Sequence, residues 1–275
     1  MTSVETIVQG HYGSGGVLDR ILAAAQQAGA DPERLTPEDL YRFDQLHAGG
    51  AAATKNHLEK SGIRPGMHVL DLGCGIGGSS RYIAAHVGCR VTAVDLTPEF
   101  VAVARELTRR CGLANIEFRE ANALALPFAD ATFDHVWSHA VTMNIADKTG
   151  FAAEVARVLK PGGRFSCAEA GQGPAGGALS YPVAWAQNAS SSFLVTPAAT
   201  RAALEAAGLR IVEQIDLTET NRAMARQERE RVERGEPPSS VPSVVMGEAF
   251  AERSRNAAKN AAENRTVEHL IVAQR

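Results

Sequence analysis

Cysteine is scarce in this 275-residue chain. Four occur, at Cys74, Cys89, Cys111 and Cys167, and no two have the spacing of a metal-binding or disulfide pair. Aromatic residues are also few, at 5% of the chain. We therefore expect the thiols to be small buried side chains, and we expect neither a disulfide framework nor a bound metal.

Long apolar runs and a charge of one sign are missing as well. No apolar stretch reaches 18 residues, so no transmembrane helix is predicted. The first 20 residues lack the basic and then apolar pattern of a secretory signal. With a formal net charge of −3, the composition favours neither nucleic acid nor an anionic membrane as a partner. These features predict a cytoplasmic protein.

The most informative stretch is residues 69–78, which read VLDLGCGIGG. Apolar residues surround one acid, and glycines follow at once, which predicts a buried strand, a tight turn and then a helix from Ser79 or Ser80. A second predicted strand over residues 90–94 ends on Asp95. An acid about 20 residues beyond a glycine loop is where ribose hydroxyls are usually bound.

Two cofactors compete for this loop. Gly73, Gly75 and Gly78 fit the G-x-G-x-x-G pattern of a dinucleotide site, which would make the protein an NAD-dependent oxidoreductase. However, the carboxylate of Asp71 would repel a pyrophosphate and attract an ammonium or sulfonium group. The acid favours S-adenosyl-L-methionine, which has both cations and no phosphate. A strand–helix junction with glycines needed only for packing is the remaining alternative.

With this D-x-G-x-G motif, the chain resembles the class I S-adenosylmethionine-dependent methyltransferases over residues 40–215. Within them it is most similar to the small-molecule group of glycine/sarcosine and sarcosine/dimethylglycine N-methyltransferases. The resemblance implies methyl transfer to a nitrogen or oxygen of a small-molecule substrate. It also implies an α/β, Rossmann-like fold: a seven-stranded, mostly parallel sheet with helices on both faces, an antiparallel last strand and a helical cap.

The resemblance also implies which residues bind the cofactor. Asp71, Gly73 and Gly75 are assigned to the methionine end, and Asp95 to the ribose hydroxyls. The adenine would lie against Leu96, with Asn122 and Ala123 at its edge and Ser138 beside the transferred methyl group. At Asn122 a purely turn-forming side chain is the alternative.

His139 follows the fourth predicted strand and is the candidate base, because an imidazole exchanges protons near neutral pH. A structural histidine bonded to backbone is the competing interpretation. Relatives have a Gln-Asp pair where this chain has His139-Ala140, so a catalytically silent cofactor-binding or assembly module is a further alternative. The candidate substrate-lining residues, each with core or cap packing as its alternative, are Tyr12, Gln45, His47, Gly49, Met143, Asn144 and Trp185.

We expect one methyltransferase domain spanning residues 1–275. Its parts are an N-terminal cap (1–60), a cofactor-binding core (61–217) with an inserted substrate loop (171–195), a helical lid (218–264) and a closing strand (265–275). Residues 219–235 alternate acids and bases and predict a solvated helix. Whether residues 220–264 form a lid or a homodimer surface is left open by the sequence.

Overall fold

The computed structural model describes residues 3–13, 15–247 and 249–275. Seven strands form one sheet in the order β3-β2-β1-β4-β5-β7-β6. Neighbouring strands are parallel from β3 to β5, whereas β7 pairs antiparallel with both β5 and β6. This sheet confirms the predicted fold class, including the antiparallel last strand. The strands are β1 (His68–Leu72), β2 (Arg90–Asp95), β3 (Ile116–Glu120), β4 (Phe133–His139), β5 (Leu159–Gln172), β6 (Arg210–Asp216) and β7 (Thr266–Gln274).

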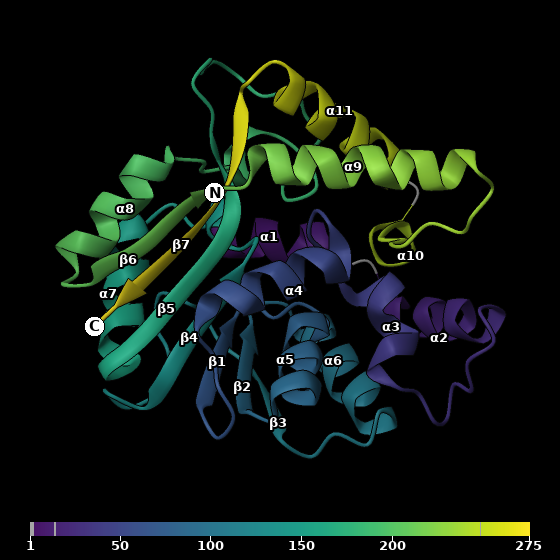
Figure 1. Cartoon of the computed structure of the whole chain (residues 1–275), viewed down its shortest axis with the longest axis horizontal. Helices are drawn as coiled ribbons and strands as arrows, with labels where there is room; N and C mark the ends of the chain where they lie inside the picture. Colours follow the sequence, from purple (N-terminus) through teal and green to yellow (C-terminus); the bar gives the residue numbers. More distant parts are fainter. Residues whose placement is uncertain (1–2, 14, 248) are drawn as a thin grey trace.

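Helices cover both faces of the sheet (Figure 1). On one face, α7 (Lys148–Val158) and α8 (Pro197–Ala206) pack on a core that includes Leu70 and Leu72 of β1. On the other, α4 (Gly50–Ser61), α5 (Gly78–Val87) and α6 (Pro98–Arg110) pack around Val69. Alternate residues of β1 thus enter different cores, as the two-residue period of a strand requires.

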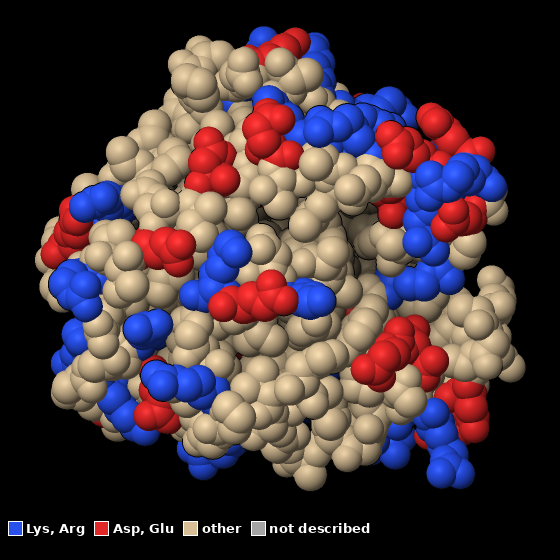
Figure 2. All heavy atoms as spheres, in the orientation of Figure 1, with Lys and Arg blue, Asp and Glu red and all other residues tan. Residues whose placement is uncertain are grey.

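The remaining helices form a roof beyond the carboxyl ends of the parallel strands. They are α1 (Val4–Tyr12), α2 (Val17–Gln27), α3 (Pro37–Asp44), α9 (Thr218–Glu233), α10 (Ser243–Met246) and α11 (Phe250–Ala262). Figure 1 shows α9 and α11 together at one side of this roof, where the Arg222 guanidinium donates to the Ala261 carbonyl. Figure 2 shows acidic and basic side chains interspersed over α9, which has no buried residue.

The end of α3 is fixed against the start of α5. Arg81 and Asp44 form an ion pair at 2.8 Å, with both side chains fully buried. Gly78 permits this contact, because a Cβ added there would lie 2.3 Å from the Asp44 carbonyl oxygen. The segment that follows α3 is therefore held directly above the glycine loop.

Three boundaries have clear local causes. Helix α1 begins at Val4, where the Ser3 hydroxyl accepts from the Thr6 N–H and caps it. Helices α10 and α11 are separated at Gly247, whose φ of 74° and ψ of −173° are outside helical geometry. Finally, α7 ends at Val158, because the chain is already paired as a strand from Leu159. Among the described helices, none is long and apolar enough to cross a membrane.

Candidate functional site

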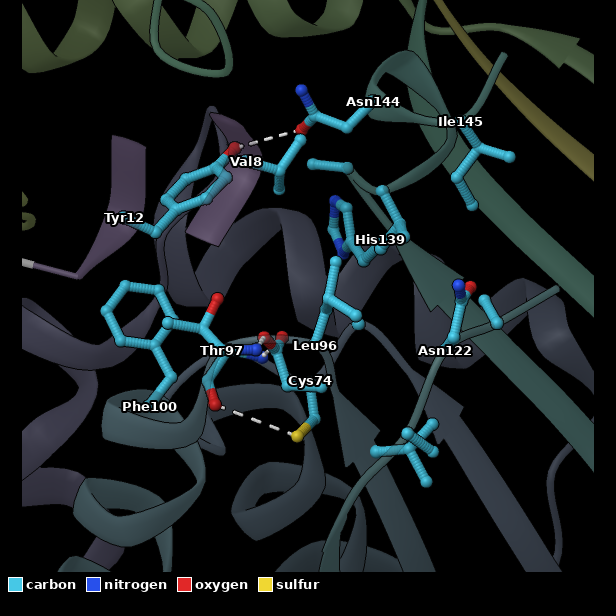
Figure 3. Close-up of a pocket in the computed structure, with 18 of the residues that line it drawn as sticks. Val8, Tyr12, Cys74, Leu96, Thr97, Phe100, Asn122, His139, Asn144 and Ile145 are labelled. Atoms are coloured by element: carbon cyan, nitrogen blue, oxygen red, sulfur yellow. Dashed lines mark hydrogen bonds between the residues drawn. The ribbon is translucent and has the colours of Figure 1, made fainter. Parts of the chain in front are cut away.

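A cavity of about 330 Å³ lies at the carboxyl ends of β1, β2 and β4. Parallel α/β sheets usually bind ligands at this edge. Figure 3 shows side chains from the sheet side and from the roof converging on it. Eleven of the residues predicted for the site line this cavity: Tyr12, His47, Asp71, Gly73, Gly75, Asp95, Leu96, Asn122, Ala123, His139 and Asn144.

Asp71 is a buried acid without a counter-charge. Its residue is 2% exposed, and its carboxylate accepts one side-chain hydrogen bond, from the Ser80 hydroxyl at 2.5 Å. Burial raises the pKa of this carboxyl to about 7. Of the described residues that line the cavity, none is a lysine or arginine. A cationic group entering beside Asp71 would supply the missing positive charge.

Asp95 connects the glycine loop to the end of β2. Its two carboxylate oxygens accept the backbone N–H groups of Gly75 and Thr97, each at 2.8 Å. Each oxygen keeps a second lone pair, so a ligand hydroxyl can still donate to it. Burial raises the pKa of the Asp95 carboxyl as well.

The glycine loop must approach its neighbours closely. Gly73 has a φ of 69°, and an added Cβ would lie 2.5 Å from a methyl carbon of Val141. The N–H groups of Gly73 and Cys74 both donate to the Val94 carbonyl, which fixes the loop on β2. Glycine is therefore needed at position 73 for conformation and for space.

Asn122 lies at the predicted adenine edge, and its amide oxygen accepts the backbone N–H of Leu124 at 2.9 Å. This bond closes a local turn, the role that the sequence left as an alternative. The same oxygen has a second lone pair, and no described residue accepts from the amide nitrogen. The side chain can thus form the turn and still contact a ligand.

His139 stacks on His47, with ring centroids 3.6 Å apart and an angle of 12° between the rings. His47 is held by the Thr54 hydroxyl at 3.0 Å and the Ala48 carbonyl at 3.3 Å. Burial holds the pKa of His139 well below its usual value, so the ring is neutral at pH 7. Its Nδ1 is buried and has no hydrogen-bond partner among the described residues, so the backbone-bonded alternative is not what the structure shows.

Helix α1 closes the far side of the cavity. The Tyr12 hydroxyl donates to the Asn144 side-chain oxygen at 3.2 Å, and the Gln9 amide donates to the Leu96 carbonyl at 2.8 Å. Val4 and Val8 complete this wall, together with Glu5. The sequence analysis missed these three residues, although the spacing of Val4, Val8 and Tyr12 is that of one helix face.

Five predicted site residues do not line the cavity. Ser138 is fully buried within β4, and no described residue partners its hydroxyl. Met143 and Trp185 pack together in the core of the 171–195 segment, where the Trp185 indole donates to the Ser192 hydroxyl. Trp185 thus packs within the segment's own apolar core, which is the alternative that the sequence left open for it. Gln45 and Gly49 lie outside the lining too.

Residues 70–167 match the protein family described as "Methyltransferase domain". A 2-methyl-6-phytyl-1,4-hydroquinone methyltransferase of Synechocystis sp. is 46% identical over 101 residues, which is 37% of this chain and 31% of that protein. Such matches span less than half the length of the curated relatives. The matched region contains the glycine loop, Asp95, Asn122 and His139.

Solved structures share the fold. Phosphoethanolamine N-methyltransferase 2 of Haemonchus contortus, in complex with phosphomonomethylethanolamine and S-adenosylhomocysteine, has a TM-score of 0.77 at 21% identity. That comparison covers 100% of this chain and 60% of the other. A structure described as a putative sarcosine dimethylglycine methyltransferase from Galdieria sulphuraria gives 0.63 at 18% identity, covering 81% and 83%.

Proposed function

We propose that the chain is a class I methyltransferase, which transfers a methyl group from S-adenosylmethionine to a nitrogen or oxygen atom of a small molecule. Its match to the methyltransferase domain over residues 70–167 and its similarity to curated methyltransferases support this proposal. The observation that supports this most directly is Asp71. A buried carboxylate beside a glycine loop, in a cavity without a described lysine or arginine, suits a cationic ligand that has no phosphate. A nicotinamide dinucleotide would place its pyrophosphate where this negative charge lies.

The lining residues fit this cofactor. Asp71, Gly73 and Gly75 would contact its methionine part, and Asp95 would accept from the ribose hydroxyls. Leu96, Asn122 and Ala123 would surround the adenine. When bound, the cofactor supplies a methyl group on a positively charged sulfur, which needs a nucleophile in line with it.

The residues of the chain then bind and orient the acceptor. The neutral ring of His139 can accept a hydrogen bond, or a proton, from an acceptor hydroxyl or ammonium group. Its stacking on His47 fixes the ring plane. Tyr12, Asn144 and the valines of α1 line the same cavity and would exclude water from the bound reactants. Correct placement of two reactants accounts for several kcal/mol of a barrier, about 7 or more in favourable cases.

A titration tests the choice of cofactor. Calorimetry with S-adenosylhomocysteine should give saturable binding, and NADH should give none. Binding of NADH without S-adenosylhomocysteine would refute the proposal and support the oxidoreductase. If S-adenosylhomocysteine binds, methyl transfer to a panel of amines, phenols and other hydroxyl compounds would separate an enzyme from a silent binding module.

A further inference from the structure

A second buried charge lies in the roof, outside the lining of the cavity. Arg253, on α11, is 8% exposed, and its Nε has no hydrogen-bond partner among the described residues. No described carboxylate forms an ion pair with it. Arg81, the other buried arginine of the described chain, also has an unpaired Nε, but its guanidinium forms an ion pair with Asp44 and donates to the Ile76 carbonyl. Buried charges without a partner are costly, so their retention calls for an explanation.

The position of Arg253 follows from its helix face. Asn256 and Asn260, three and seven residues further along α11, contact the segment beneath it: Asn256 donates to the Pro182 carbonyl, and Asn260 exchanges hydrogen bonds with the Ser180 backbone. Residues at this spacing share one face of a helix. Arg253 therefore faces the same side as these two asparagines.

Helix α1 borders the same segment. The His11 ring bonds the Ala184 carbonyl at 2.9 Å, two residues after the Pro182 carbonyl that Asn256 contacts. Burial lowers the pKa of His11 and raises the pKa of Tyr12, and the positive charge of Arg253 acts to lower both. Tyr12 in turn lines the cavity. Arg253 thus lies at the junction of α1, α11 and the 180–184 segment, where its charge acts on Tyr12 in the wall of the cavity.

We propose that Arg253 binds an oxyanion, either a carboxylate or a phosphate group, on the methyl acceptor. That the anion belongs to the methyl acceptor rests on the proposed function. That Arg253 binds an anion does not depend on it. A guanidinium binds such groups through paired hydrogen bonds, and an anion would neutralise the charge that the fold leaves uncompensated. The acceptor would then place its neutral or cationic nucleophile near His139 and its anionic end at the roof.

The test uses inorganic phosphate and acetate as probes, without any cofactor. Thermal unfolding of the full chain is followed as each anion replaces chloride at constant ionic strength. Arg253→Met is compared with Arg255→Met, which removes an exposed arginine from the same helix. The two probes distinguish a phosphate site from a carboxylate site.

We expect phosphate or acetate to raise the unfolding midpoint of the wild type and of Arg255→Met. Arg253→Met should bind the same anion more than about tenfold more weakly. In chloride, Arg253→Met should be at least as stable as the wild type, because it removes an uncompensated charge. A merely structural arginine would give a less stable variant instead. Equal anion binding by the wild type and Arg253→Met, or no binding by the wild type, would overturn the proposal whether or not the protein transfers methyl groups.

Discussion

Replacing Asp71 with asparagine should make the protein more stable and less able to bind its cofactor. The folded protein holds the pKa of this carboxyl at about 7, against an ordinary value of 3.8. The native state therefore keeps a proton that the unfolded state releases, so stability falls as the pH rises from about 4 to about 7. The difference between these two pKa values lowers the unfolding free energy of the wild type by about 4 kcal/mol above pH 7. Asparagine does not ionise, and its amide oxygen can still accept from Ser80.

The assay is thermal unfolding between pH 4 and pH 8, with Asp19→Asn, on the exposed surface of α2, as the matched control. At pH 8 the midpoint of Asp71→Asn should exceed that of the wild type by about 8–16 °C, since 1 kcal/mol corresponds to about 2–4 °C in a domain of this size. The gap should close toward pH 4, where the wild-type carboxyl is protonated. Asp19→Asn should follow the wild type throughout.

Affinity gives the second half of this prediction. S-adenosylhomocysteine carries an ammonium group, so Asp71→Asn should bind it more than about tenfold more weakly at pH 8. Wild-type affinity should fall as the pH is lowered through 7, because the carboxyl loses its charge there. If Asp71→Asn binds with wild-type affinity, Asp71 is not the contact for a cation. If its stability depends on pH as the wild type's does, Asp71 is not the titrating group.

Three further changes test other parts of the site. Asp95→Ala should weaken S-adenosylhomocysteine binding in calorimetry by more than about tenfold, because it removes the proposed ribose acceptor and the bond to the glycine loop. Unchanged affinity would exclude the ribose contact. His139→Phe keeps the stacked ring but not its nitrogens, so turnover should fall while calorimetry shows normal cofactor affinity, and full turnover would remove the histidine from the chemistry. Asp44→Asn leaves the buried Arg81 unpaired and should cost about 3–5 kcal/mol in denaturant unfolding, whereas a loss under 1 kcal/mol would mean that the pair is unimportant.

The sequence predicted the sheet and the position of Asp71, Gly73 and Asp95 around one cavity, because these depend on local patterns. Alternating apolar residues, cap residues and glycines mark β1, β2 and the loop between them directly. All three residues lie at the carboxyl ends of β1 and β2, where the geometry of one β-α-β unit places them.

The roof was less predictable because its contacts join distant residues. Nothing near Trp185 in the sequence shows that the 171–195 segment forms its own small core with Met143. Helix α1 has no buried residue, so its short apolar face gave a weak signal. Arg253 reads as one of many surface charges until α11 is folded over the segment at 180–184. The contacts that define this region join distant residues: Asn144 with Trp185, and His11 with Ala184, each more than 40 positions apart.

The place of β7 in the sheet bears on how the protein folds during synthesis. Strand β7 (residues 266–274) lies between β5 and β6, so β6 cannot join the sheet until the ribosome has translated the strand that links it to β5. One edge of β5 is therefore unpaired throughout the synthesis of some 90 residues, a state prone to aggregation. Chaperone binding during translation would protect this edge, and chains that stop before residue 266 would expose it permanently.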